Sequence, residues 1–346
     1  MELSTRKQQI LLAIITEYIE SAEPVGSRTI ARKYKFGLSP ATIRNEMSDL
    51  EEMDFIEQPH TSAGRIPSAS GYRYYVDYLM QKQSLSLEEE EVIRQEYSCK
   101  VRDVGLLLQR TGQLLSQLTH YAAVVLSPKT EAGTYKHIQL IEMGIGRAML
   151  VVIIDNGTIQ HRILDMPASI TRSDLATISS MLNAKLSGQT METIKFTLIK
   201  EIYSELTRHK HTLDMILEVL RYSLTHGSAD KVYLGGFFNI LNHPEFRSIE
   251  KVKTLVSLLE QESLLVNLLS QVSQPGVNVR IGGEMSCHEI QDCSIVTATY
   301  EVGGQPVGSL GILGPVRMDY ARVISVLEYT TRNLSIALER LFKRWR

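Results

Sequence analysis

Cysteine is scarce in this 346-residue sequence, which holds only Cys99, Cys287 and Cys293. A low and odd count in a chain of this length argues against a disulfide framework and for a reducing compartment. Long apolar runs are missing as well. The longest, residues 148–154, is much too short to span a bilayer, and the first residues lack the apolar core and cleavage site of a signal peptide. We therefore expect a cytoplasmic protein with no membrane association.

An excess of charge of either sign is also missing. The formal net charge is −2, and the first 80 residues hold nine basic against eleven acidic side chains. The molecule as a whole therefore has no general attraction for a polyanion such as DNA. Any nucleic-acid binding has to come from a local surface on which basic side chains gather.

Motifs of enzymes and metal sites are lacking too. The sequence has no phosphate-binding loop, no zinc-protease motif and no nucleophile-elbow serine, and residues 144–146 lack the third glycine of a dinucleotide fingerprint. Cys287, His288 and Cys293 have the spacing C-H-x4-C without a fourth ligand, which suits structural zinc poorly. We expect a protein that is not an enzyme, with no metal site and no cofactor.

The start of the chain has the element order of a winged helix-turn-helix. Apolar residues at helical spacing follow the N-cap Ser4 and stop before Glu23-Pro24, and a short second helix begins near residue 26. The elements expected after the turn at Gly37 are a third helix within residues 38–53, a strand at 55–57, a polar loop at 59–65, a return strand from 66 and a closing helix at 71–80. Helix, helix, turn, helix, hairpin and closing helix together predict this fold.

The third helix, in the stretch LSPATIRNEMSDLEEM, is the element that we expect to bind DNA. Ser39 is its N-cap and Pro40 its first helical residue, where a missing N–H costs nothing. Ile43, Met47 and Leu50 form one apolar stripe at helical spacing, so that stripe is predicted to be buried. The polar residues between them are left to face outward.

Those outward residues have donors and acceptors that match base edges. Arg44 suits guanine, whose O6 and N7 it can bind with two hydrogen bonds, and Asn45 suits N6 and N7 of adenine. Ser39 and Thr42, near the helix N-terminus, suit a phosphate or a base edge. This part of the helix is therefore predicted to lie in the major groove.

Basic residues gather beside this helix, because residues 25–45 include five basic side chains and no acidic one. In the loop HTSAGR, residues 60–65, small residues allow close approach of the backbone to DNA. The predicted DNA-binding side chains are Arg28, Lys33, Lys35, Ser39, Thr42, Arg44, Asn45, His60 and Arg65.

Beyond a polar linker at residues 81–87, helical and strand patterns alternate. A 3–4 repeat over residues 88–118 predicts a helix or helix pair, suited either to a partner chain or to packing within its own chain. Strands are predicted at 122–126, 137–142, 147–154, 159–165, 277–281, 294–300 and 306–313, and helices at 172–186, over most of 190–270 and at 319–345.

These patterns predict an α+β multidomain protein. The sequence Asp155-Asn156-Gly157 is a strong hairpin signal between two of the strands. The economical interpretation of the two strand-rich segments is one sheet domain interrupted by an inserted helical piece. Two independent small sheets are the alternative.

The run EPVGSRTIARKYKFGLSPATIRNEMSDLEEMDFIEQPHTSAGRIPSASGYRYYVDYLM resembles the N-terminal signature of the bacterial heat-inducible transcription repressor family HrcA. The later segments DNGTIQHRIL, YLGGFFNIL, IGGE and GSLGILGPVRMDYARVI fit the same family. The resemblance covers essentially the whole chain. It implies a winged-helix DNA-binding domain, a GAF-like mixed sheet domain and an inserted, mainly helical dimerisation domain.

With this resemblance, domain bounds follow. We expect a winged helix-turn-helix at residues 1–82, a linker helix region at 83–120, the GAF-like domain at 121–186 and 271–346, and the inserted dimerisation domain at 187–270. The surface that forms the dimer stays open between the insert and the helix at 88–118.

The resemblance also implies a function. A homodimer is expected to bind an inverted-repeat operator in double-stranded DNA upstream of chaperone operons and to repress them. The GroEL chaperonin is expected to keep the repressor active, and heat relieves repression because unfolded clients occupy the chaperonin. The alternative is a metabolite-sensing transcription regulator that uses the GAF-like domain as its sensor.

Overall fold

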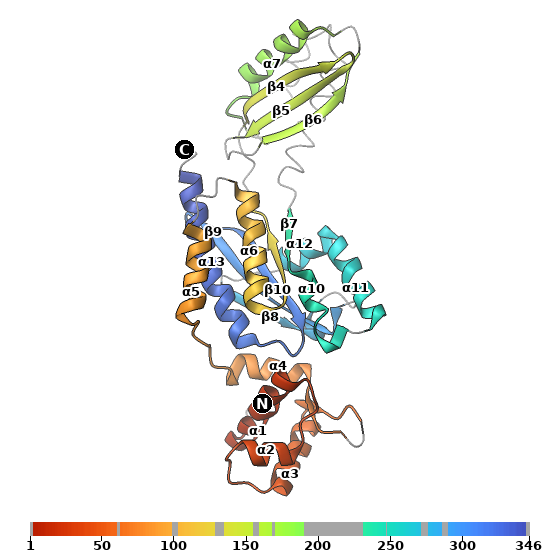
Figure 1. Ribbon diagram of the computed structural model, residues 1–346, viewed down its shortest axis with the longest axis vertical. Helices are drawn as coiled ribbons and strands as arrows, with labels where there is room; N and C mark the ends of the chain where they lie inside the picture. Colours follow the sequence, from red (N-terminus) through yellow and green to blue (C-terminus); the bar gives the residue numbers. More distant parts are fainter. Residues whose placement is uncertain are drawn as a thin grey trace. The chain divides into compact units, whose positions relative to one another are not determined.

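The computed structural model describes residues 3–60, 63–98, 103–128, 135–154, 159–167, 170–189, 231–246, 248–270, 276–285 and 290–343 (Figure 1). The chain forms two compact units. The first comprises residues 1–127 and 232–338, and the second comprises residues 128–231 and 339–346.

The first unit begins with a winged helix-turn-helix, as the sequence predicts. Its elements are α1 (Thr5–Ser21), α2 (Ser27–Lys33), α3 (Pro40–Glu52), β1 (Ile56–Glu57), β2 (Ile66–Pro67), α4 (Ala69–Tyr74) and the π-helical turn η1 (Tyr75–Leu79). The predicted closing helix is thus α4 continued by η1. β1 and β2 form the antiparallel hairpin of the wing.

Local sequence explains these bounds. The Ser4 hydroxyl accepts a hydrogen bond from the Lys7 N–H at 3.4 Å and caps α1, which ends at Ser21 before Glu23-Pro24. Gly37 has a φ of 68°, which glycine adopts without strain, so the chain can turn into α3. Ile43 and Leu50 are fully buried in α3, and Met47 is nearly so, which confirms the predicted stripe.

The rest of the first unit is built on a five-stranded antiparallel sheet in the order β7-β3-β10-β9-β8. Its strands are β3 (Ala122–Leu126), β7 (Val232–Gly235), β8 (Val277–Ile281), β9 (Cys293–Val302) and β10 (Gln305–Pro315). Gly303 and Gly304, both at positive φ, make the turn from β9 to β10. The chain leaves this sheet at the end of β3 and returns to it on β7, the strand that pairs with β3. Residues 128–231 lie between these two points.

Helices cover both faces of the sheet. One face packs on α10 (Phe237–Ile240), η3 (Pro244–Phe246), α11 (Ile249–Glu260) and α12 (Glu262–Ser270), in a core that includes Val124, Ile295 and Leu313. The other face carries α6 (Val104–Thr119) and α13 (Tyr320–Lys343), and the Ser294 hydroxyl lies 2.7 Å from that of Tyr320. The predicted C-terminal helix is confirmed as α13.

The helices predicted at 88–118 are α5 (Leu87–Ser98) and α6, and both pack within their own chain. The Tyr97 hydroxyl of α5 lies 2.9 Å from the Thr111 hydroxyl of α6. Arg322 of α13 binds Glu89 of α5 at 2.6 Å. The helix pair is therefore held within its own chain, as part of the sheet domain.

The second unit has its own sheet and its own core. β4 (Tyr135–Gly144), β5 (Arg147–Ile154) and β6 (Ile159–Asp165) form a three-stranded antiparallel sheet, and α7 (Arg172–Leu186) packs on it. The core joins Ile138, Leu150 and Leu164 to Ile178 and Leu182. Thr171 begins α7 with a capping box to Asp174.

The predicted bounds of the inserted piece are therefore wrong. We expected residues 121–186 to belong to one sheet with 277–313, but only β3 does, and residues 128–231 form the insert. Helices α10–α12, expected in the insert, pack on the five-stranded sheet instead. The reason is that β4–β6 bury one face against α7 and need no strand from elsewhere, a choice of partner that strand periodicity does not encode.

Other predictions have different outcomes. The strand β7 was not predicted. The hairpin turn at 155–157 lies outside the described residues, although β5 and β6 pair as it predicts. The helical stretch at 190–230 also lies outside them, as do Cys287 and His288. The likeness of the five-stranded sheet domain to a GAF domain stays a prediction.

A close approach of two glycines fixes α6 against β7. A Cβ placed on Gly235 would lie 2.1 Å from the carbonyl oxygen of Gly112. No side chain fits on the strand at that point, so position 235 depends on glycine, whereas a Cβ on Gly112 would lie 3.5 Å from its nearest neighbour, an ordinary contact.

Replacing Gly235 by alanine should therefore separate α6 from the sheet. We expect Gly235→Ala to lower the free energy of unfolding by about 1–3 kcal/mol, as other overpacked cores do, measured by denaturant titration. Gly283→Ala is the matched control, because a Cβ there meets no atom within 4 Å. Equal stability of Gly235→Ala and the wild type would contradict the close approach.

Candidate nucleic-acid interface

The third helix presents polar residues on a rigid, capped element. The Ser39 hydroxyl accepts a hydrogen bond from the Thr42 N–H at 3.1 Å and lies 2.9 Å from the Thr42 hydroxyl. Arg44 and Asn45 are exposed one turn further on, and Ser48 follows them on the surface. The structure therefore brings together the four predicted residues of α3, two at its cap and two on its open face.

Two acidic residues of α3, Glu46 and Asp49, face α1. Lys7 binds Glu46 at 2.9 Å and Asp49 at 2.8 Å, and Arg6 binds Glu46 at 3.3 Å. The hydrogen bonds from Lys7 to Asp49 and Glu46 raise the pKa of the lysine, so it stays charged. These ion pairs neutralise these two carboxylates and hold them against α1.

Lys33, predicted to face DNA, is held toward α1 instead. Its ammonium lies 2.5 Å from Glu17 and 3.2 Å from Glu20, and these contacts raise its pKa. Burial alone would raise the pKa of Glu17. The hydrogen bonds from Lys33 and Tyr34 lower it by more than burial raises it, so the pKa is lowered overall. Lys33 thus completes a charged cluster within the domain, which the local sequence did not reveal.

Arg65, at the base of the wing, is also engaged. Its guanidinium binds Glu51 of α3 at 2.8 Å, and its backbone exchanges hydrogen bonds of 2.8 and 2.9 Å with Val25. A Cβ on Gly64 would lie 2.5 Å from the Val25 carbonyl, so the glycine permits this contact. The wing is therefore fastened to the segment between α1 and α2, a pairing that the sequence analysis missed.

The remaining predicted cations are open to solvent. Arg28, Lys35 and Arg44 are exposed, and within the described part of the chain no ion pair involves them. His60, at the tip of the wing, is exposed too, next to residues 61 and 62, which lie outside the described range.

A groove of about 440 Å³ lies between α2, α3 and the wing. Its walls include the three arginines Arg28, Arg44 and Arg65. Glu51 neutralises Arg65, which leaves two uncompensated guanidinium groups from different elements on one groove. Such a groove suits an anion or the acceptor edge of a base. Gln58, Ser27 and Gly64 also line it, and of these the local pattern pointed only to Gly64, as a small residue of the loop 60–65.

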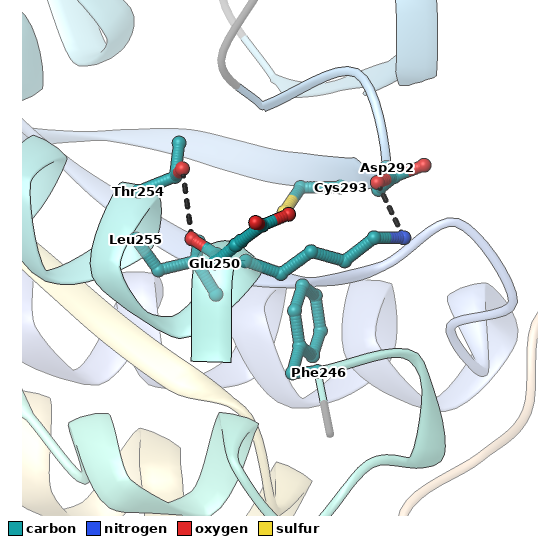
Figure 2. Close-up of a pocket in the computed structure, with 7 residues that line it drawn as sticks. Phe246, Glu250, Thr254, Leu255, Asp292 and Cys293 are labelled. Atoms are coloured by element: carbon teal, nitrogen blue, oxygen red, sulfur yellow. Dashed lines mark hydrogen bonds and ion pairs between the residues drawn. The ribbon is translucent and has the colours of Figure 1, made fainter. Parts of the chain in front are cut away.

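The sheet domain has a separate pocket of about 380 Å³ beside α11 (Figure 2). Phe246, Leu255 and Cys293 form its apolar part. Lys251, which also lines it, binds Asp292 at 2.7 Å. Burial raises the pKa of the Cys293 thiol to about 12, so that cysteine is an inert apolar group rather than a nucleophile. Because its lysine is already paired, we assign no ligand to this pocket.

Among the described residues, no cluster of three or more metal-ligating side chains is present. No described helix is both long and apolar enough to cross a membrane.

Comparisons with known proteins agree with this geometry. Residues 2–77 match the family model "Winged helix-turn-helix transcription repressor, HrcA DNA-binding", and residues 106–324 match "HrcA protein C terminal domain". The chain is 61% identical over 344 residues to the heat-inducible transcription repressor HrcA of Pelotomaculum thermopropionicum and 57% identical over 344 residues to that of Desulforamulus reducens. Both alignments cover 99% of each chain.

One solved structure covers nearly the whole chain. It is described as the crystal structure of a hypothetical protein, with a TM-score of 0.68 and 25% sequence identity. The match covers 98% of this chain and 100% of that one. The arrangement of a winged helix followed by a sheet domain is thus shared with a solved structure.

Proposed function

Because the chain belongs to the HrcA family of heat-inducible transcription repressors, we propose that it binds an inverted-repeat operator of chaperone operons as a homodimer. It is a DNA-binding repressor and not an enzyme. The observation that carries the proposed contact is the exposed Arg44-Asn45 pair on a capped helix beside the groove lined by Arg28.

Base reading is assigned to the open face of α3. Arg44 binds O6 and N7 of guanine, and Asn45 binds N6 and N7 of adenine, each through two hydrogen bonds. The buried stripe and the cap fix the orientation of α3, so these side chains approach the major groove from a rigid support.

Phosphate contacts are assigned to the residues around this face. Arg28 and Lys35 supply free positive charge, and the Ser39 and Thr42 hydroxyls supply short polar contacts at the start of α3. His60 supplies a donor on the wing. Lys33 and Arg65 contribute less, because each is already paired with a carboxylate.

The dimer surface is assigned to the insert, residues 128–231. The alternative, the helix pair α5 and α6, is occupied by its own sheet domain. In contrast, the face of the β4–β6 sheet opposite α7 exposes Ile141, Met143 and Ile163. Met149 is the cross-strand partner of both Ile141 and Ile163, so these residues form one apolar patch. Twofold pairing there would give two reading helices for two half-sites.

Control by heat is assigned to the chaperonin. GroEL keeps the repressor folded in the cytoplasm, and unfolded proteins compete for it during heat stress. Repression then falls and chaperone synthesis rises.

The base-reading role predicts a loss of both affinity and selectivity. Arg44→Ala and Asn45→Ala should each weaken the free energy of binding to the cognate inverted repeat by about 1–3 kcal/mol. Both variants should bind a scrambled duplex as tightly as the wild type does. Fluorescence anisotropy on the two duplexes measures this. Arg332→Ala, an exposed arginine on α13, is the matched control. Unchanged operator affinity of Arg44→Ala would mean that α3 is not the reading helix.

The ion pairs predict different salt dependences for two neighbouring lysines. Lys35→Ala should reduce the slope of log K against log salt by about 1, because a free phosphate contact is lost. Lys33→Ala should change the slope less, since Glu17 and Glu20 already neutralise that ammonium. Anisotropy titrations at several salt concentrations measure the slopes, and a larger effect at Lys33 than at Lys35 would contradict the assignment.

The proposed control predicts that the chaperonin raises the active fraction. Protein diluted from denaturant should yield more operator-binding dimer with GroEL, its cochaperonin and ATP than with the chaperonin lacking nucleotide. Stoichiometric operator titration measures that fraction. Equal active fractions in the two reactions would rule out this form of control.

A further inference from the structure

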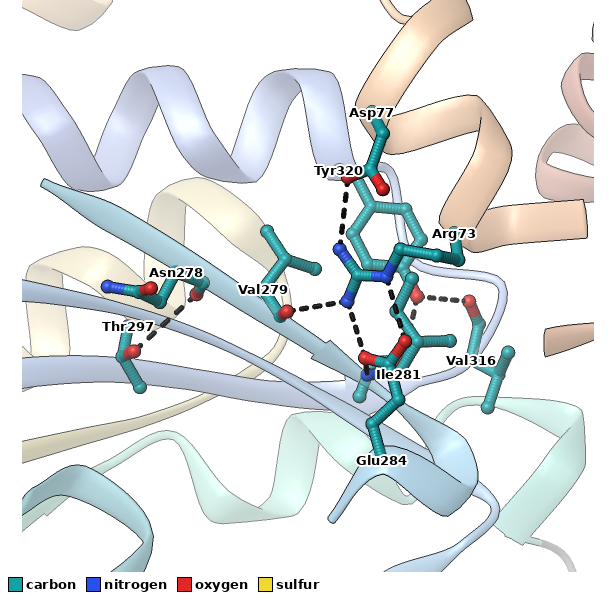
Figure 3. Close-up of polar contacts among 10 residues, drawn as sticks. Arg73, Asp77, Asn278, Val279, Ile281, Glu284, Thr297, Val316 and Tyr320 are labelled. Carbon is teal, nitrogen blue, oxygen red and sulfur yellow. Dashed lines mark hydrogen bonds and ion pairs between the residues drawn. The ribbon is translucent and has the colours of Figure 1, made fainter. Parts of the chain in front are cut away.

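The winged helix is attached to the sheet domain by an arginine of its closing helix (Figure 3). The Arg73 Nε donates to Glu284 at 2.8 Å, and its Nη2 donates to the Val279 carbonyl at 2.6 Å and also to Glu284. Its Nη1 donates to Asp77, one turn along the closing helix, at 3.2 Å. All three guanidinium nitrogens are therefore used, two of them across the domain boundary.

The carboxylate that receives Arg73 is itself held in place. Glu284 also accepts a hydrogen bond from the Ile281 N–H at 2.9 Å, where β8 ends. Burial raises the pKa of Glu284, but the hydrogen bonds from Arg73 and the Ile281 N–H outweigh it, so the net shift is downward. Glu284 stays ionised, and a bidentate pair of this kind fixes an angle as well as a distance.

A second arginine makes the reciprocal contact. Arg317, just before α13, donates its Nη1 to the Ile19 carbonyl in the last turn of α1 at 2.9 Å and binds Glu245 through Nε. That carbonyl has no partner within its helix, and the negative end of the helix dipole favours a cation there. The Tyr72 ring also packs against the Tyr320 ring, with the two ring centroids 5.9 Å apart.

The orientation of the winged helix depends on these contacts for two reasons. A cleft of about 360 Å³ stays open between the closing helix and the β8–Glu284 segment, lined by Phe55, Tyr78 and Gly283 among others, so packing alone does not fill the joint. The connection itself, residues 81–86, has no regular secondary structure and is mostly exposed.

We propose that the Arg73–Glu284 contact is a positioning device that fixes the angle of each reading helix and thereby sets which half-site spacing the dimer accepts. The inference rests on the proposed binding of an inverted repeat. With the Arg73–Glu284 contact broken, the remaining contacts of the joint can open, and the six linker residues then allow each head an excursion of about 13 Å as a flexible coil. The two heads can then still reach both half-sites when half a helical turn of DNA is added to the spacer, which increases the distance between the half-sites by roughly 17 Å.

The test compares two operators, one with the natural spacer and one with a spacer longer by about 5 base pairs, half a helical turn. Wild-type protein should bind the longer operator at least about tenfold more weakly, because its second head faces the wrong side of the duplex. Arg73→Gln should bind the natural operator nearly as well as wild type, with the spacing penalty reduced to less than about threefold.

Three controls make the result specific. Glu284→Gln removes the other side of the contact and should reproduce the reduced penalty, which guards against misfolding of one variant. Arg94→Gln removes an ion pair on the surface of α5 and should leave the penalty unchanged. A duplex with one half-site should bind all variants equally, because no variant changes the reading face.

The outcomes are distinct. An unchanged spacing penalty in both Arg73→Gln and Glu284→Gln overturns the positioning role, as does a wild-type protein that accepts both spacers equally. A wild-type protein that binds neither inverted repeat contradicts the proposed function instead. The Arg73–Glu284 pair is chosen over Arg317 because it is more exposed, whereas loss of Arg317 would leave the mostly buried Glu245 side chain unpaired.

Discussion

The proposed reading surface depends on ion pairs inside the winged helix, because acidic side chains outnumber basic ones in that domain. Lys7 forms ion pairs with Glu46 and Asp49, Lys33 forms one with Glu17, and Arg65 forms one with Glu51. Each pair involves at least one partly exposed side chain and contributes little to stability. Their effect is on the distribution of charge: they neutralise acids at the contact of α1, α3 and the wing, and the uncompensated cations are left near the open end of α3.

The sequence predicted the winged helix almost residue by residue, because its signals are local. Caps, a proline at the first helical position and a 3.6-residue apolar stripe determine α3 without reference to the rest of the chain. The choice of ionic partners was not predictable in the same way. Lys33 and Arg65 look like Lys35 and Arg44 in sequence, and only the fold brings Glu17 and Glu51 to the first two. The predicted assignment of the strands to one sheet was wrong for the same reason. Periodicity predicts a strand and which of its faces is buried, but not which strand lies next to it.

The joint between the winged helix and the sheet domain is polar and incompletely satisfied. Among the described residues, the buried Tyr72 hydroxyl and one carboxylate oxygen of Glu245 have no hydrogen-bond partner. Unpaired buried groups each cost about 1–3 kcal/mol, which offsets part of what the two arginines contribute. A joint of this composition opens at lower cost than the apolar sheet core unfolds. The orientation of the winged helix is accordingly held less firmly than the strands of the sheet core.

The position of β3 has a consequence for how the chain is made. As the protein leaves the ribosome, β3 emerges before the insert, whereas both strands that flank it, β7 and β10, emerge afterwards. Until then its apolar sequence AAVVL has unpaired edges, and the buried face of α6 has no sheet to cover it. Pairing across such long separations is slow and leaves the nascent chain prone to aggregation. This one sheet is therefore completed only after the chain on both sides of the insert has been made.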